Sequence, residues 1–192
     1  LGKSRQPPAI WLTPYLRLRE DPKAVLPEWT KLIEAEQALL QRSPDQSNAE
    51  FAAALLYQQA ILEREQGKKE VAEETARRAR ESRSGMRQSQ LGLHLDSAYA
   101  LRERGLFQWA ELEYRQVLAA GMSRYWAGAQ IKLSEMWHDQ GKHLAAAEAR
   151  QELVRAIEQN KLRGVNLEAM EINIADIRAR MNYFFACHWE EK

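Results

Sequence analysis

Four histidines and one cysteine are the residues of this sequence best suited to bind a metal, or to act as a nucleophile and its base. Glu135 and His138 lie three residues apart, so on a helix the two side chains would share one face. Carboxylate-bound metal sites in helical bundles use this Glu-x-x-His unit twice. None of the other histidines, which are His94, His143 and His188, has a carboxylate three residues earlier. We therefore expect no metal and no cofactor.

The pair Cys187 and His188 could suggest a thiol nucleophile with an imidazole base. Consecutive residues of a helix point about 100° apart, so these two side chains would not face each other. The sequence also lacks a phosphate-binding glycine loop, a Gly-x-Ser-x-Gly turn and a His-Glu-x-x-His helix. The residues favour a protein without enzymatic activity, and a metal or thiol enzyme is the competing hypothesis.

A basic cluster between residues 77 and 83 could contact phosphate or an acidic partner. Glutamates precede it by three to four residues, and Glu-before-Arg pairs stabilise a solvated helix. We expect the cluster to be such a helix face. Its members are Arg77, Arg78, Arg80 and Arg83.

The composition excludes several classes of protein. The chain has 192 residues, with 45% hydrophobic and 29% charged residues, which is ordinary for a soluble globular protein. The 28 basic and 27 acidic residues leave a net charge of +1, so a dedicated nucleic-acid binder is not expected. No apolar run is long enough to insert into a membrane. We expect a soluble protein, either cytoplasmic or extracytoplasmic (for instance periplasmic). The first residue is Leu1, so an upstream signal could have preceded it.

The order of prolines and glycines predicts an all-α protein. Residues 1–22 carry four of the six prolines and should form an irregular arm. Helical periodicity dominates the remaining segment, 23–192, and short glycine-marked connections divide it. The predicted elements are a first helix over 27–42, helical hairpins over about 48–82, 88–120 and 123–163, and a final helix over 167–190.

Small residues recur at fixed offsets from three glycines, which indicates a structural repeat. Gly67, Gly105 and Gly141 are separated by 38 and 36 residues. A small residue precedes each glycine by seven positions, and an alanine follows each by five. Two helices of a hairpin approach closely only where both lack bulk, so each small pair should meet across its turn. The pairs are Ala60 with Ala72, Ala98 with Ala110, and Ser134 with Ala146.

This pattern resembles the tetratricopeptide repeat (TPR) family over roughly residues 50–192. The family's small-to-alanine step occurs three times, and its aromatic positions are kept at Tyr114, Trp137 and Trp189. The family's opening tryptophan and closing proline are missing, so the repeats are degenerate. The resemblance implies a right-handed α-solenoid of antiparallel helical hairpins.

The resemblance also implies a concave groove that binds a protein or a peptide, without chemistry. Its groove residues lie one helical turn on either side of each small position, and many are tyrosines or arginines, which are common at interfaces. Tyr57 and Ile61 stand where some co-chaperones of the family carry Lys and Asn, which puts binding of a chaperone tail in doubt. The expected groove residues are Tyr57, Arg64, Tyr99, Arg102, Glu135, His138 and Tyr183.

The final helix has no partner helix after it in this pattern. It should then expose Phe184, Phe185 or Trp189 to a further helix or to another chain. The alternative function is therefore a structural one, in which the chain is an assembly segment of a larger protein or forms a homo-oligomer through its final helix.

Overall fold

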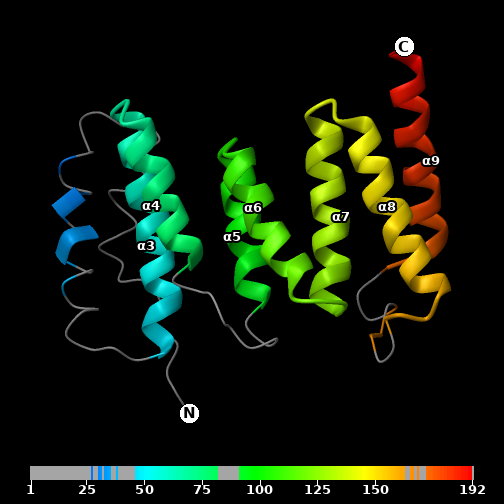
Figure 1. Ribbon diagram of the computed structural model, residues 1–192, viewed down its shortest axis with the longest axis horizontal. Coiled ribbons are helices and arrows are strands. Elements are labelled where there is room, and N and C mark those ends of the chain that lie inside the picture. Colours follow the sequence, from blue (N-terminus) through cyan, green and yellow to red (C-terminus); the bar gives the residue numbers. More distant parts are fainter. Residues whose placement is uncertain are drawn as a thin grey trace. The chain divides into compact units, whose positions relative to one another are not determined.

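The computed structural model describes residues 27, 30–31, 33–35, 38, 46–81, 91–162, 165–166, 168 and 172–191. Within these residues the regular structure is helical and no strand occurs, which confirms the all-α prediction (Figure 1). The chain divides into two compact units, Leu1–Gly85 and Met86–Lys192, which we call the first and the second unit. The arm predicted over residues 1–22 lies outside the described residues.

The first unit contains α3 (Gln46–Glu65) and α4 (Lys69–Glu81), which pack against each other. The bounds agree closely with the two helices predicted within 48–82. Of the first predicted helix, 27–42, residues 27, 30–31, 33–35 and 38 are helical, and the others lie outside the described residues.

The described part of the second unit contains five α-helices, each packed against the next along the chain. Helix α5 also contacts α7. Figure 1 shows α7, α8 and α9 side by side. The helices are α5 (Leu91–Glu103), α6 (Phe107–Ala119), α7 (Arg124–Asp139), α8 (His143–Glu158) and α9 (Ile174–Glu190).

Three turns between paired helices share one hydrogen-bond pattern. At Gly105 the glycine N–H donates to Arg102 O at 2.8 Å, and the next N–H, of Leu106, donates to Leu101 O at 3.0 Å. The turns at Gly67 and Gly141 repeat both bonds. The three glycines have φ values of 72°, 79° and 73°, in the left-handed region that glycine adopts without strain. The prediction that these glycines end helices is confirmed.

The six small residues used to define the repeat are all buried, with at most 1% of each exposed. They lie on helices that pack in pairs, α3 with α4, α5 with α6, and α7 with α8. Their burial agrees with close approach of paired helices, because a larger side chain would have no space there.

The end of α8 and the start of α9 differ from the prediction. Helix α8 ends at Glu158 rather than near 162 because Asn160 takes a left-handed φ of 53°. Asparagine tolerates this conformation best after glycine, and Lys161 N–H bonds Ala156 O at 2.9 Å as in the glycine turns. Helix α9 begins at Ile174 rather than 167, because the side chain of Asn173 accepts the N–H of Ala175 at 2.8 Å and caps the helix there.

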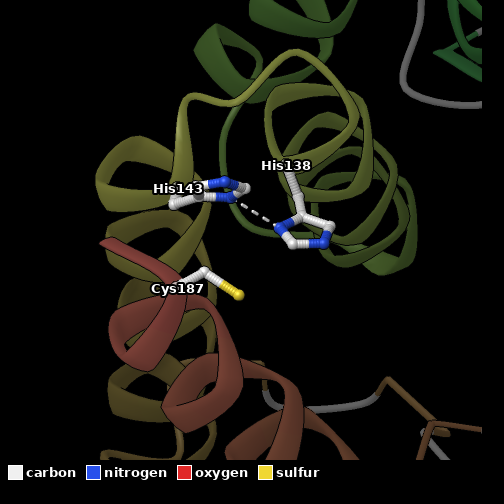
Figure 2. A group of neighbouring side chains, drawn as sticks. All are labelled: His138, His143 and Cys187. Atoms are coloured by element: carbon white, nitrogen blue, oxygen red, sulfur yellow. Dashed lines mark hydrogen bonds between the residues drawn. The ribbon is translucent and has the colours of Figure 1, made fainter. Parts of the chain in front are cut away.

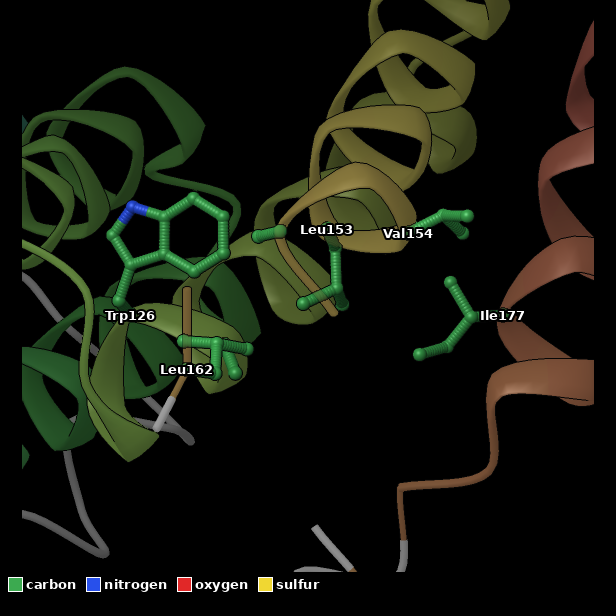
Figure 3. Packing of buried hydrophobic residues seen from close by; sticks show 7 residues of the cluster. Trp126, Leu153, Val154, Leu162 and Ile177 are labelled. Carbon is green, nitrogen blue, oxygen red and sulfur yellow. The ribbon is translucent and has the colours of Figure 1, made fainter. Parts of the chain in front are cut away.

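One hydrophobic cluster ties α9 to the rest of the second unit (Figure 3). Leu153 and Val154 of α8 face Ile177 of α9, and Trp126 of α7 joins from the other side. Near the other end of α9, Phe184 is 2% exposed and packs against alanines of α8. Of the three candidates for an exposed apolar side chain on the final helix, Phe184 is excluded because α8 covers it. Trp189 is 72% exposed, as expected.

Among the helices of the described residues, none is both long and apolar enough to cross a membrane.

Candidate functional site

The predicted groove residues fall into both units. Tyr57 and Arg64 belong to α3 of the first unit, where Arg64 is exposed. Tyr57 is only 4% exposed, so the expectation that its side chain is open to a partner is wrong. The remaining five lie on three helices of the second unit: Tyr99 and Arg102 on α5, Glu135 and His138 on α7, and Tyr183 on α9.

Helices α5 and α7 are joined by ion pairs among these residues. Arg102 donates to Asp139 Oδ2 at 2.6 Å and lies 3.7 Å from Glu135 Oε2. Burial by itself would lower the pKa of Arg102, but the hydrogen bond and charge of Asp139 outweigh it and raise the pKa. Two of the predicted groove residues, Arg102 and Glu135, are therefore held in place by each other and by Asp139.

A buried arginine of α8 contacts the carboxylate of Glu135. Arg150 of α8 is 3% exposed and donates from Nε to Ser134 Oγ at 2.6 Å and from Nη2 to Glu135 Oε1 at 3.3 Å. Lys132 adds a third cation, 3.2 Å from Glu135 Oε2. Burial lowers the pKa of Arg150, and the carboxylate of Glu135 opposes that effect. The carboxylate of Glu135 thus pairs with three cations and does not form a carboxylate–imidazole unit with His138.

His138 instead lies close to two residues that the sequence analysis did not group with it. His143 Nδ1 lies 2.8 Å from His138 Nδ1, across the turn at Gly141 (Figure 2). Cys187 of α9 completes a group whose potential ligand atoms all lie within 4.8 Å of one another. Figure 2 shows the thiol on the side where both rings lie. Two nitrogens and a sulfur in this arrangement could bind a cation. We call His138, His143 and Cys187 the His–His–Cys cluster.

Neighbouring groups fix the two rings of the cluster. Phe184 stacks on His138 with centroids 4.3 Å apart, and Tyr183 meets the same ring edge-on at 5.4 Å. Glu191 Oε1 lies 3.0 Å from Nε2 of His143. Burial and the nearby His143 lower the pKa of His138, which favours the neutral imidazole.

Two of the predicted groove residues are exposed aromatic side chains. Tyr99 is 52% exposed on α5 and Tyr183 is 58% exposed on α9. A hydrogen bond to the sulfur of Cys187 raises the pKa of the Tyr183 hydroxyl. Between them lies α7, which carries Glu135 and His138 and contacts both helices. Five of the seven predicted groove residues therefore lie on α5, α7 and α9, where Arg102 pairs with Glu135 and His138 contacts Tyr183.

A buried contact between a histidine and a carboxylate in the second unit was not predicted. Nδ1 of His94 on α5 contacts the carboxylate of Glu113 on α6, and both side chains are at most 5% exposed. The spacing could have revealed it, because His94 lies four residues before Ala98 and Glu113 three after Ala110, at facing levels of the paired helices. Its burial makes the pair a structural contact between α5 and α6.

Arg77 and Arg78 of the basic cluster are exposed on α4, whereas Arg80 is half-buried. Arg77 bonds Glu74 at 2.6 Å and also pairs with Glu81, and all three side chains are about half exposed. The hydrogen bond with Arg77 lowers the pKa of Glu74. The expected pairing of glutamates with arginines is confirmed at Arg77, while Arg83 lies outside the described residues.

In comparisons with known proteins, no family model, no curated protein and no solved structure matches this chain.

Proposed function

We propose that the chain is a TPR-like protein-interaction module whose second unit binds a protein or peptide segment without catalysing a reaction. The proposal includes a right-handed α-solenoid of antiparallel helical hairpins, with α5, α7 and α9 as the helices that line the groove. We call their five predicted groove residues the α5–α7–α9 face, namely Tyr99, Arg102, Glu135, His138 and Tyr183.

The observation that carries the proposal is the combination of exposed tyrosines with preordered charges. Tyr99 and Tyr183 are more than half exposed, and ion pairs hold Arg102 and Glu135 in place on α5 and α7. Tyrosine and arginine dominate binding energy at interfaces because they combine large apolar area with a polar group. Charges that are already ordered lose little conformational entropy on binding.

The charges of the face indicate the chemistry of the partner. Three cations, Arg102, Lys132 and Arg150, surround two carboxylates, Glu135 and Asp139. Lys132 keeps 49% of its side chain exposed. A segment with apolar side chains for the tyrosines and at least one carboxylate for the exposed cation would complement this surface.

The test compares two double variants. The immobilised chain is used to capture proteins from extracts of its source cells, and the affinity of each purified partner is then measured. We expect Tyr99→Ala/Arg102→Ala to weaken binding by about tenfold or more, since loss of an interface hot spot costs about 2 kcal/mol.

The control is Phe107→Ala/Arg155→Ala, which likewise removes one aromatic residue and one arginine, both exposed and on α6 and α8. It should bind like the wild type. Equal recovery of partners by both double variants would remove the α5–α7–α9 face as the binding surface.

A second function, assembly through α9, is favoured by a different observation. Trp189 is 72% exposed at the end of the helix, on which Tyr183 is also exposed. Large exposed aromatic side chains on one helix are typical of contacts between chains. Light scattering of the wild type should then give a multimer that Trp189→Ala converts to a monomer. A monomeric wild type at high concentration excludes this alternative.

A further inference from the structure

The His–His–Cys cluster has the donor atoms of a transition-metal site. Its three ligands come from the last turn of α7, the first residue of α8 and the last turn of α9. All three side chains are half-buried, so an ion could reach them from solvent. Imidazole nitrogen and thiolate sulfur select Zn²⁺ and similar cations over Mg²⁺ or Ca²⁺, which prefer oxygen ligands.

The turn at Gly141 holds the two histidines at a short separation. Gly141 N–H donates to His138 O at 2.9 Å, and Lys142 N–H donates to Trp137 O at 2.8 Å. These bonds connect the end of α7 rigidly to the start of α8. The Nδ1 atoms lie 2.8 Å apart, and two nitrogens at about 2.0–2.1 Å from a tetrahedral zinc ion would lie roughly 3.3 Å apart. Small rotations of the two imidazole rings would increase the separation of the Nδ1 atoms to that value.

Glu191 gives His143 the hydrogen-bond partner that metal-bound histidines have. Its Oε1 is 3.0 Å from Nε2 of His143, so Nε2 carries the proton and donates it to the carboxylate. The lone pair of His143 then lies on Nδ1, the atom that points to His138 and the cluster. The proton of their shared hydrogen bond is on His138, and it leaves Nδ1 for Nε2 when a cation binds.

Contacts with α9 hold the third ligand in place. Phe184, three residues before Cys187, is buried against Ala146 and Ala147 of α8 and stacks on His138. This packing anchors the last turns of α9 beside the histidines. The cluster thus depends on contacts that would exist without a metal, so the apo protein already presents the ligands.

We propose that His138, His143 and Cys187 bind one Zn²⁺ ion through two Nδ1 atoms and the thiolate, with water in the fourth position. The thiol proton is released to solvent on binding. The ion joins α9 to the turn between α7 and α8. This inference does not depend on the proposed binding function, because it concerns a different set of contacts.

The experiment uses the full chain, without an affinity tag, stripped of metal and kept reduced. Calorimetric titration with Zn²⁺ should give one ion per chain. Titration with Co²⁺ should give a sulfur-to-metal charge-transfer band and intense visible bands of a tetrahedral site. Bound Zn²⁺ should also slow alkylation of Cys187. Absence of saturable binding, or a Co²⁺ complex without the sulfur band, would overturn the proposal.

Variants distinguish the residues that bind the metal from neighbouring residues that do not. Cys187→Ser should weaken Zn²⁺ binding by about 100-fold, and Glu191→Gln, which changes only the hydrogen-bond partner, by about 10-fold, as expected for an outer-shell group. His188→Asn is the matched control, because this histidine adjoins Cys187 but lies outside the cluster. Unchanged circular dichroism of the apo Cys187→Ser protein shows that it folds. Equal weakening by His188→Asn would contradict the assignment.

Discussion

Individual buried polar residues of the second unit make contacts between its helices, in addition to those of the apolar core. Glu113 is fully buried on α6 and contacts His94 of α5, and Arg150 is buried on α8 beneath Glu135. A buried charge is tolerated only where partners compensate for lost hydration. Each of these residues therefore makes a specific polar contact between two packed helices.

Removal of Glu113 should destabilise the chain strongly. Glu113→Ala leaves His94 buried without its carboxylate, so we expect the free energy of unfolding to fall by about 3 kcal/mol. Urea denaturation followed by circular dichroism measures the change. Glu103→Ala, at an exposed position of α5, is the control and should lie within about 0.5 kcal/mol of the wild type. A loss under 1 kcal/mol for Glu113→Ala would mean that the buried pair contributes little.

Sequence reasoning succeeded for residues whose position follows from the repeat and failed for those that depend on later packing. Ala98 and Ala110 lie at fixed offsets from Gly105, and both are fully buried on the paired helices α5 and α6. Tyr57 lies three residues before Ala60, at an offset assigned to the groove, yet it is buried. The meeting of His138, His143 and Cys187 requires α9 to pack back on α8, and no periodicity encodes that contact.

At the scale of elements, the connections between helices are the best-determined feature. The turns at Gly67, Gly105 and Gly141 have the same pair of hydrogen bonds, and Asn160 ends α8 in the same way. Their boundaries could be predicted because a glycine is a local signal. The start of α9 could not, since only the asparagine cap at Asn173 marks it.

A side chain at position 105 should lower the free energy of unfolding only because of the backbone conformation there. A Cβ there would meet no atom within 4 Å, but φ is 72°. Gly105→Ala should therefore lower the free energy of unfolding by about 1–2 kcal/mol. Gly105→Asn, the matched variant, should cost clearly less because asparagine tolerates this conformation. Equal losses in urea denaturation would show that the left-handed turn is not the cause.

The contact between α6 and α7 should depend on pH through Glu111. Burial would raise the pKa of this carboxyl, but hydrogen bonds from Trp137, at 3.1 Å, and Arg115, at 2.8 Å, lower it below 4.5. A lowered pKa in the folded state stabilises the protein above the unfolded-state pKa, and the gain is lost as pH falls through the folded-state value.

Glu111→Gln tests this dependence. At pH 7 the variant should be less stable by about 1 kcal/mol, and the difference should shrink as the pH falls below about 4.5. Urea denaturation from pH 7 to pH 3 measures it. The exposed Glu148→Gln on α8 is the control. A difference that stays constant with pH would contradict the role of the carboxylate.

At the scale of the whole chain, one helical-pair pattern occurs in both units. The same turn joins α3 to α4 in the first unit and α5 to α6 and α7 to α8 in the second. The fold class and this period could be predicted because both follow from local spacing of glycines and small residues. The His–His–Cys cluster could not be predicted, because it combines side chains from helices distant in sequence.

The central claim is that the α5–α7–α9 face binds the partner. Hydrogen–deuterium exchange of the chain, free and saturated with a captured partner, tests this claim most directly. We predict slower exchange in α5 and α7 around Arg102 and Glu135 and in α9 around Tyr183, with α6 unchanged. Protection confined to α6, or absent from all three helices, would contradict the account.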